Sequence, residues 1–228
     1  MKDLKELNRS ELIDELKKAG FPSYRGEQIF NWLYKNGVSK TKEMKNIPKK
    51  MREFIDDNYN LTDLKEINNS LATDGTVKYL WELKDGENIE GVYLPFPESG
   101  RHSACISTQV GCGLGCSFCA TGIDGLKRNL TAGEIVDQVI KVQKDISAEN
   151  FGEPRLSNVV FMGMGEPLAN FDNVMKAVEI INANIKNKIK YNSKLNQPFL
   201  GTKYISHNFI SSEFLYNNGF FESKSLLP

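Results

Sequence analysis

The four cysteines of this 228-residue chain all lie between positions 105 and 119, and this grouping constrains the fold and function more than any other feature. A secreted disulfide-bonded protein spreads its cysteines so that they join distant segments. Four cysteines in one short stretch instead indicate a metal or redox site in a reducing compartment. The N-terminus is charged from Lys2 onward, and no apolar run approaches the roughly 20 residues that cross a bilayer. We therefore expect a cytoplasmic protein with no membrane partner.

Three of these cysteines have the spacing of an iron-sulfur ligand set. Cys112, Cys116 and Cys119 form a C-x3-C-x2-C pattern in a glycine-rich loop that follows a predicted strand. Three thiolates on such a loop can each ligate one iron of a [4Fe-4S] cluster and leave the fourth iron open. The open iron can chelate the amino and carboxylate groups of S-adenosylmethionine (SAM), whose reductive cleavage gives a radical. The alternative is a structural zinc site with Cys105 as the fourth thiolate, although zinc knuckles usually combine two C-x2-C pairs.

A second glycine-rich stretch, Gly163-Met-Gly-Glu-Pro167, follows the next predicted strand. Glycines at the C-terminal end of a strand let a ligand approach the backbone, and Glu166 offers a carboxylate to an ammonium group. SAM carries such a group. Alone this stretch is weak evidence, because a glycine turn before a helix is common. Together with the cysteine loop, it predicts a SAM site.

The first part of the chain is predicted to be a helical domain followed by a hairpin. Residues 1–60 carry short amphipathic helices, with a capping box at Asn8 and Glu11 and a later helix that has Pro48 at an N1-like position. They form a small N-terminal accessory domain. Residues 61–97 alternate apolar and polar side chains on both sides of Asp85-Gly86, which predicts a β-hairpin connector.

The pattern changes to strand, loop and helix in succession over residues 98–182. We expect strands over 104–110 and 157–162, a helix that opens with a capping box at Thr131 and Glu134, and a helix from Asn170. Such alternation implies parallel βα units, so the fold class is α/β and this segment is the first part of a partial (β/α) barrel. Residues 183–228 form an atypical tail, rich in Asn, Lys, Ser and Phe, with a strand expected over 204–210.

The net charge of the chain does not indicate a nucleic-acid partner. The 29 Lys and Arg balance the 29 Asp and Glu, so any RNA site would have to be a local patch. The basic runs at 49–52 and 127–128 could contact phosphates, but a short basic run is more often a solvated face. With only His102 and His207 available, catalysis by paired histidines is disfavoured.

Three motifs closely resemble the RlmN/Cfr family of radical SAM RNA methyltransferases. They are Cys105-Ile-Ser-Thr-Gln-Val-Gly-Cys112 continuing to Phe118-Cys-Ala-Thr-Gly122, then Leu126-Lys-Arg-Asn-Leu-Thr-Ala-Gly-Glu-Ile135, then Phe161-Met-Gly-Met-Gly-Glu-Pro167. Phe21-Pro-Ser-Tyr-Arg-Gly-Glu-Gln-Ile29 and Ile47-Pro48 resemble that family's N-terminal domain, so the likeness covers residues 5–182. The resemblance implies RNA binding by the accessory domain and methylation of adenine in 23S rRNA and tRNA, at C2 in RlmN or, as the alternative, at C8 in Cfr. Glu166-Pro167-Leu168 and Gly133 favour the RlmN type.

The same resemblance implies a role for each matching residue. Cys112, Cys116 and Cys119 ligate the [4Fe-4S] cluster, Phe118 packs near the SAM adenine, and Gly165 with Glu166 contacts the SAM methionyl end. Cys105 matches the resolving cysteine, which attacks the methyl carrier as a disulfide forms and product leaves. Glu90 matches a proton acceptor, with a solvated hairpin charge as the alternative. The implied electron donor is a flavodoxin or ferredoxin, and the protein is expected to be a monomer.

The chain departs from that family after its second βα unit. The family's methyl-carrying cysteine should follow there, yet no cysteine follows Cys119. The remaining residues are also too few for the rest of a barrel. We therefore expect a truncated chain that is inactive alone, either a frameshifted or fragmentary product or a genuine short paralogue. A non-catalytic remnant that binds the cluster or RNA is the alternative.

Overall fold

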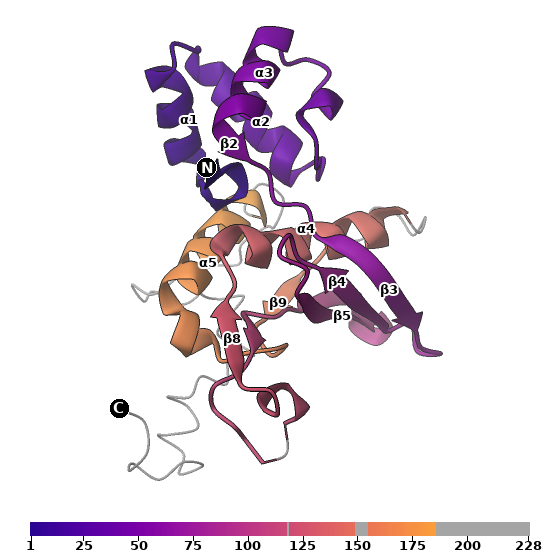
Figure 1. Ribbon diagram of the computed structural model, residues 1–228. Coiled ribbons are helices and arrows are strands. Elements are labelled where there is room, and N and C mark those ends of the chain that lie inside the picture. The colour runs from indigo at the N-terminus through magenta and orange to yellow at the C-terminus, as the bar shows by residue number, and fades with distance from the viewer. Residues whose placement is uncertain (118, 149–154, 186–228) are drawn as a thin grey trace, which may run out of the picture.

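The computed structural model describes residues 1–117, 119–148 and 155–185. A helical unit at the N-terminus stands above a sheet that is covered by two longer helices (Figure 1). The predicted strand over 204–210, the tail after residue 185 and Phe118 lie outside the described residues. No helix in the described ranges is both long and apolar enough to cross a membrane.

The N-terminal unit is built from short helices, as predicted. They are η1 (Leu4–Glu6), α1 (Arg9–Lys18), α2 (Ser23–Tyr34), η2 (Thr41–Glu43) and α3 (Lys49–Asn58), and β1 (Lys2–Asp3) pairs in parallel with β2 (Tyr59–Asn60). The capping box is confirmed, because Asn8 Oδ1 accepts the Glu11 N–H and Glu11 Oε2 accepts the Asn8 N–H, both at 2.9 Å. Pro48 is the N-cap of α3 and not its N1 residue, so this helix begins one residue later than predicted.

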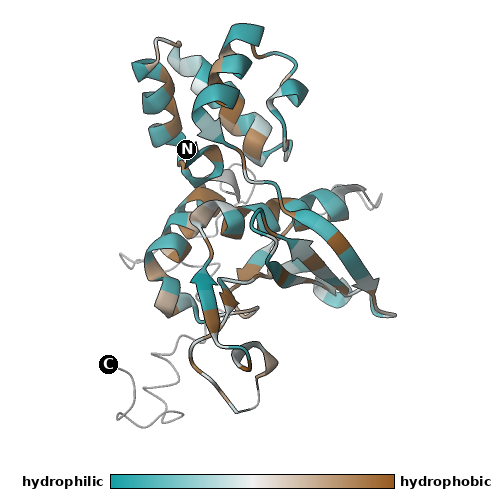
Figure 2. Cartoon of the chain, in the orientation of Figure 1, coloured by the Kyte–Doolittle hydropathy of each residue, from teal (hydrophilic) through white to brown (hydrophobic). Residues whose placement is uncertain are grey.

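This unit has its own apolar core. Figure 2 shows apolar and polar residues alternating along its helices, as amphipathic helices require. The core combines Leu12 and Leu16 of α1, Ile29, Phe30 and Leu33 of α2, and Met51 and Ile55 of α3, all buried. The helices are too short to be stable alone, so this shared core holds them together.

A five-stranded sheet follows the helical unit. Its strands, in spatial order, are β3 (Lys65–Leu71), β4 (Val77–Glu82), β5 (Asn88–Phe96), β6 (Arg101–Cys105) and β9 (Asn158–Val160). The predicted hairpin is confirmed, because β4 and β5 pair antiparallel on either side of Asp85-Gly86. β5 continues to Phe96 and pairs antiparallel with β6, so the hairpin and the βα segment share one sheet. β3 was not predicted, because all its residues are exposed and it lacks an alternating apolar pattern.

The two predicted βα units are present. β6 and β9 are parallel, α4 (Ala132–Ala148) lies between them in sequence, and η5 (Pro167–Asn170) leads from β9 into α5 (Phe171–Ile185). Both helices share a core with one face of the sheet, which includes Tyr79, Trp81, Ile135, Val159 and Ile180. The opposite sheet face is therefore left half-buried, and it carries the predicted site residues Glu90 and Cys105.

The predicted strand over 104–110 is wrong as a single element. The structure divides it into β6, in the large sheet, and β7 (Gln109–Gly111), which pairs antiparallel with β8 (Leu126–Asn129) in a separate ribbon. The strand breaks because Thr108 and Gln109 both donate their N–H groups to the Met164 carbonyl, at 2.8 and 3.2 Å. The predicted strand over 157–162 is correspondingly short, since its last residues leave the sheet as β9 ends at Val160.

Candidate functional site

The cysteine loop extends from the ribbon that β7 and β8 form. Gly111, the last residue of β7, has a φ of 73°, and a Cβ there would overlap the carbonyl oxygen of Gly125. The Cys112 N–H donates to that oxygen at 3.0 Å and closes the loop at its base. In Figure 1 the loop projects from the ribbon on the side away from the helical unit.

The three loop cysteines carry free, partly exposed thiols. The Cys119 N–H donates to the Cys116 carbonyl at 3.0 Å, so a tight turn holds these two residues near each other. Hydrogen bonds from Thr121, mainly from its side chain and also from its backbone, lower the pKa of the Cys119 thiol. The thiolate, which is the form that binds iron, is therefore favoured at this position.

Cys112, Cys116 and Cys119 provide three thiols on one loop, which is the number of thiolates that a [4Fe-4S] cluster with one open iron takes. In the described residues, no three His, Cys, Asp or Glu side chains gather closely enough to hold one metal ion. The ligands of a single zinc ion share one coordination sphere, whereas each thiolate of a [4Fe-4S] cluster binds its own corner of the cube. Cys105, the fourth ligand of the zinc interpretation, lies on β6 and outside the loop.

Cys105 and Glu90 lie on the same, half-buried face of the large sheet. Cys105 is opposite Val92 in the β5–β6 pair, and Glu90 precedes Val92 by two residues. Residues two apart on a strand share a face, so Glu90 is a diagonal neighbour of Cys105. Burial raises the pKa of the Cys105 thiol more than a hydrogen bond from the Met162 backbone lowers it. Glu90 forms an ion pair with Lys78 at 2.7 Å.

The second glycine-rich loop packs directly on the segment that precedes the cysteines. Gly163 donates its N–H to the Ile106 carbonyl at 3.0 Å, and Met164 donates its N–H to Ser107 Oγ at 2.8 Å. Gly165 has a φ of 98°, and a Cβ there would lie 2.5 Å from the Gln109 Cβ. The side chain of Glu166 accepts the Leu168 N–H at 3.0 Å and caps η5. The two motifs, far apart in sequence, are thus joined in space.

Buried polar residues that no sequence motif indicates make these connections. Gln109 and Gln138 are fully or nearly fully buried, and Asn170 donates to the carbonyls of Thr108 and Leu130, both at 2.8 Å. Their positions fall where periodicity predicts only apolar burial. No local pattern distinguishes these buried amides from exposed ones.

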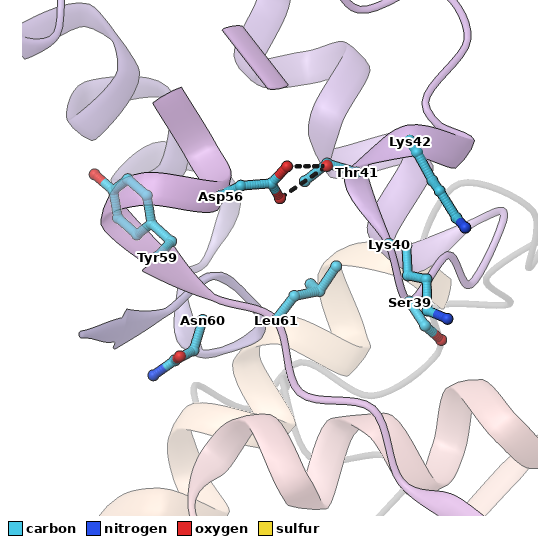
Figure 3. A pocket seen from close by; sticks show the side chains of 8 residues that line it. All are labelled: Ser39, Lys40, Thr41, Lys42, Asp56, Tyr59, Asn60 and Leu61. Atoms are coloured by element: carbon cyan, nitrogen blue, oxygen red, sulfur yellow. Dashed lines mark hydrogen bonds between the residues drawn. The ribbon is translucent and has the colours of Figure 1, made fainter. Parts of the chain in front are cut away.

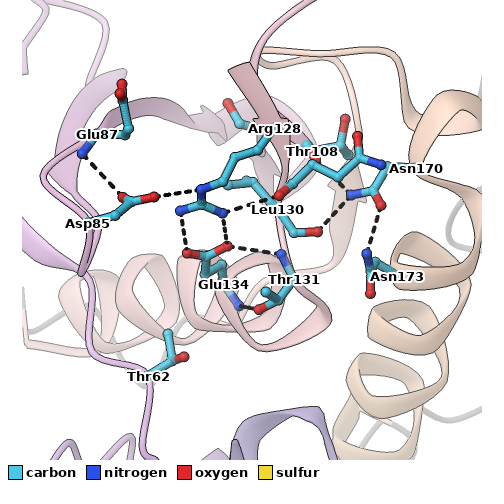
Figure 4. A network of polar contacts seen from close by, with 12 residues as sticks. Thr62, Asp85, Glu87, Thr108, Arg128, Leu130, Thr131, Glu134, Asn170 and Asn173 are labelled. Atoms are coloured by element: carbon cyan, nitrogen blue, oxygen red, sulfur yellow. Dashed lines mark hydrogen bonds and ion pairs between the residues drawn. The ribbon is translucent and has the colours of Figure 1, made fainter. Parts of the chain in front are cut away.

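Arg128 of β8 joins the cysteine ribbon to the hairpin turn and to the start of α4 (Figure 4). Its guanidinium binds both Glu134 oxygens, at 2.8 and 2.9 Å, and its Nε donates to Asp85 Oδ2 at 2.6 Å. Lys127 pairs with Glu87 at 2.7 Å. The predicted capping box of α4 is confirmed, because Thr131 and Glu134 bond each other's N–H groups. The two side chains of this basic run are therefore occupied by carboxylates of the same chain.

A pocket of about 360 Å³ lies in the helical unit (Figure 3). It is lined by Ser39, Lys40, Thr41, Lys42, Asp56, Tyr59, Asn60 and Leu61. The Thr41 hydroxyl donates to Asp56, and Lys40 and Lys42 are the basic side chains among the lining residues. The pocket contains none of the predicted site residues.

Comparison with known proteins places both parts of the chain in one family. The family described as "Ribosomal RNA large subunit methyltransferase N-terminal domain" matches residues 2–61, and the radical SAM superfamily matches residues 106–205. A relative from Thermotoga neapolitana, named "Probable dual-specificity RNA methyltransferase RlmN", is 43% identical over 183 residues. Relatives of the same name from Dictyoglomus thermophilum and Aquifex aeolicus are 44% and 45% identical over 182 and 173 residues. The chain belongs to the RlmN family.

A solved structure supports the same assignment. The crystal structure of a radical SAM methyltransferase from Sphaerobacter thermophilus is 39% identical, has a TM-score of 0.73, and matches 80% of this chain and 52% of that one. The Thermotoga and Dictyoglomus relatives likewise match 80% of this chain and 51% of their own length. This RlmN-family chain thus spans about half the length of the curated relatives it matches. The superfamily match reaches residue 205, beyond residue 182 where the predicted resemblance ended.

Proposed function

We propose that this chain is the cluster- and SAM-binding part of a radical SAM RNA adenine methyltransferase of the RlmN type. The observation that carries the proposal is the direct packing of the Gly163–Glu166 loop on residues 106–109, which lead into the cysteine loop. This contact joins the loop that carries Glu166 to the segment that leads into the cysteine loop. A ligand that binds a cluster iron and presents an ammonium group suits this arrangement.

In this proposal Cys112, Cys116 and Cys119 hold the [4Fe-4S] cluster. Gly165 and Glu166 receive the methionyl end of SAM, and Phe118 covers its adenine. When bound, the cluster supplies the electron that cleaves SAM to a radical. The lowered pKa of Cys119 favours iron binding, and the hydrogen bond from the Cys112 N–H to the Gly125 carbonyl closes the loop at its base.

Glu90 and Cys105 take the two remaining catalytic roles. Glu90 accepts a proton on the half-buried sheet face, and its ion pair with Lys78 orients the carboxylate. Cys105 is the resolving thiol, and because burial raises its pKa, a base must remove its proton before the sulfur can attack. The family's methyl-carrying cysteine is not among the 228 residues, so this chain alone does not complete transfer to adenine C2 in 23S rRNA or tRNA.

Anaerobic reconstitution with iron and sulfide tests the cluster. The expected result is about four irons and four sulfides per chain. Single replacement of Cys112, Cys116 or Cys119 by Ala should abolish this, whereas Cys105→Ala, a matched control, should keep the full load. Full loading of the Cys119→Ala variant would exclude the proposed ligand set. Zinc bound at one per chain, without iron-dependent absorbance, would favour the structural-site alternative.

RNA binding is assigned in this proposal to the helical unit, at the pocket that Lys40 and Lys42 line. Lysines at a pocket rim can neutralise phosphates, and each contact that is lost makes binding less salt-dependent. The double variant Lys40→Ala/Lys42→Ala should bind a 23S rRNA fragment more weakly and with a smaller salt slope. Lys17→Ala/Lys18→Ala on α1, also exposed but outside the pocket, is the control. Equal loss in both pairs would show that the pocket has no special role.

A further inference from the structure

Gln109 lies on the strand that leads into the cysteine loop, and its side chain bonds the glycine-rich loop directly. It lies on β7, three residues before Cys112, and it is 1% exposed. Its Oε1 accepts the Glu166 N–H at 2.9 Å, and its Nε2 donates to Asn129 Oδ1 at 2.8 Å. Asn129 is its cross-strand partner on β8, the strand by which the chain leaves the cysteine loop.

These contacts fix the glycine-rich loop from several sides. The backbone N–H of Gln109 donates to the Met164 carbonyl at 3.2 Å, and its Cβ packs where only a glycine fits at position 165. Asn129 adds a longer contact, with its Nδ2 donating to the Ala169 carbonyl at 3.4 Å. A glutamine amide can rotate by half a turn, so Asn129 also sets which end of Gln109 faces Glu166.

We propose that Gln109 is a positioning residue that holds the Gly163–Glu166 loop at a fixed place relative to the cysteine loop. This inference rests on the proposed function, since the distance between these loops must match the reach of one SAM molecule. Gln109 touches no reacting atom in this scheme. Its contribution is to keep the Glu166 backbone and side chain where the methionyl end arrives, so that SAM binds without first ordering the loop.

The main test is Gln109→Met, which keeps the size of the side chain and removes both amide contacts. The matched control is Gln143→Met on α4, because Gln143 Oε1 also accepts a backbone N–H, that of Leu156 at 2.9 Å, but outside the site. With iron content measured per chain, SAM affinity is read from the change in the electron paramagnetic resonance spectrum of the reduced cluster. Loss of one such hydrogen bond corresponds to about tenfold weaker binding.

A second readout does not need the cofactors. In the iron-free chain, amide hydrogen exchange at Glu166 should speed up in Gln109→Met and stay unchanged in Gln143→Met, because only the first removes the acceptor of this N–H. The exchange measurement separates the two proposals. If the wild-type chain binds neither cluster nor SAM, the proposed function fails, while Glu166 exchange still decides whether Gln109 positions the loop.

The outcomes are distinct. Weaker SAM binding at unchanged iron content, with faster Glu166 exchange, supports the role of Gln109. Wild-type SAM affinity or wild-type exchange in Gln109→Met overturns it. If Gln109→Met does not fold, variants of the exposed Asn129 provide the test. Asn129→Asp keeps an acceptor for Gln109 Nε2 but loses the longer contact with Ala169, so it should bind SAM more tightly than Asn129→Ala, which loses both contacts. Equal affinity in these two variants would overturn the inference.

Discussion

Removal of the Asp137 carboxylate should be the most damaging single polar substitution between the helical unit and the sheet. Asp137 of α4 and Lys5 of η1 form an ion pair whose side chains are 0% and 1% exposed. The second Asp137 oxygen accepts the Leu64 N–H at 2.8 Å, at the point where the chain enters β3. One carboxylate thus connects the N-terminal unit, the connection to the sheet and α4.

The expected loss in the free energy of unfolding comes from the two polar groups that Asp137→Ala would leave without a partner. The Lys5 ammonium and the Leu64 N–H would both be buried without their partner, and breaking a buried pair on one side costs about 3–5 kcal/mol. That is a large share of the roughly 5–15 kcal/mol that stabilises a typical domain. The double variant Lys5→Met/Asp137→Leu removes the charge together with its partner and should cost less, about 1–3 kcal/mol, for the unpaired Leu64 N–H.

Urea unfolding followed by circular dichroism measures these differences. The control is Asp63→Asn, which breaks a second Lys–Asp pair, with Lys141, where the lysine and aspartate side chains are 25% and 38% exposed. This control should cost no more than about 1 kcal/mol. The reasoning is refuted if Asp137→Ala costs as little as the control at equal urea dependence, or if the double variant is as unstable as Asp137→Ala.

Three further predictions concern single contacts. Arg128→Lys loses the bidentate contact with Glu134 and should lower the free energy of unfolding by about 1–2 kcal/mol, as measured by urea unfolding. It should also speed the loss of iron in air, as measured by the absorbance of the cluster. With the three loop cysteines replaced by Ser, the rate of Cys105 alkylation should reach half its maximum at a pH above 9.0, the ordinary pKa of a cysteine thiol, since burial disfavours the thiolate. A midpoint at a lower pH would contradict this. Burial raises the pKa of Glu11, but bonds from Lys176 and the Asn8 backbone bring it below its ordinary 4.5. The stability difference between wild type and Lys176→Met, no more than about 1 kcal/mol, should therefore be present at pH 7 and vanish as pH falls through that lowered value.

Local signals predicted most elements because they depend on neighbouring residues. Both capping boxes formed with the predicted pairs, and the Asp85-Gly86 turn joins the expected strands. β3 was not predicted because all its residues are exposed and it therefore has no alternating apolar pattern. Its backbone pairing with β4 holds it in the sheet. The strand over 104–110 failed for a long-range reason, since the Met164 carbonyl takes the N–H groups of Thr108 and Gln109.

The candidate site was predictable in its chemistry and not in its connections. Cysteine spacing and the glycine-rich stretch are patterns within short segments, and from them the sequence predicts two ligand-binding loops. That Cys105 and Glu90 would share a sheet face required the register of β5 against β6, which no local pattern specifies. The contacts of Gln109 could not be foreseen either, because a buried glutamine looks the same in sequence as an exposed one.

The first turns of α4 show why these buried polar residues occur together. Asp137 and Gln138 follow Glu134 by three and four residues, so both lie one turn further along the same side of the helix. All three side chains are buried. Glu134 holds Arg128 beside the cysteine loop, Asp137 holds the N-terminal unit, and Gln138 accepts the Ser107 N–H at 2.8 Å. Ser107 in turn holds the glycine-rich loop through Met164. Apolar side chains could pack at this place, but their contacts have no preferred direction and would not fix the positions of three separate segments. The directional hydrogen bonds of Glu134, Asp137 and Gln138 therefore set the geometry that the two motif loops require.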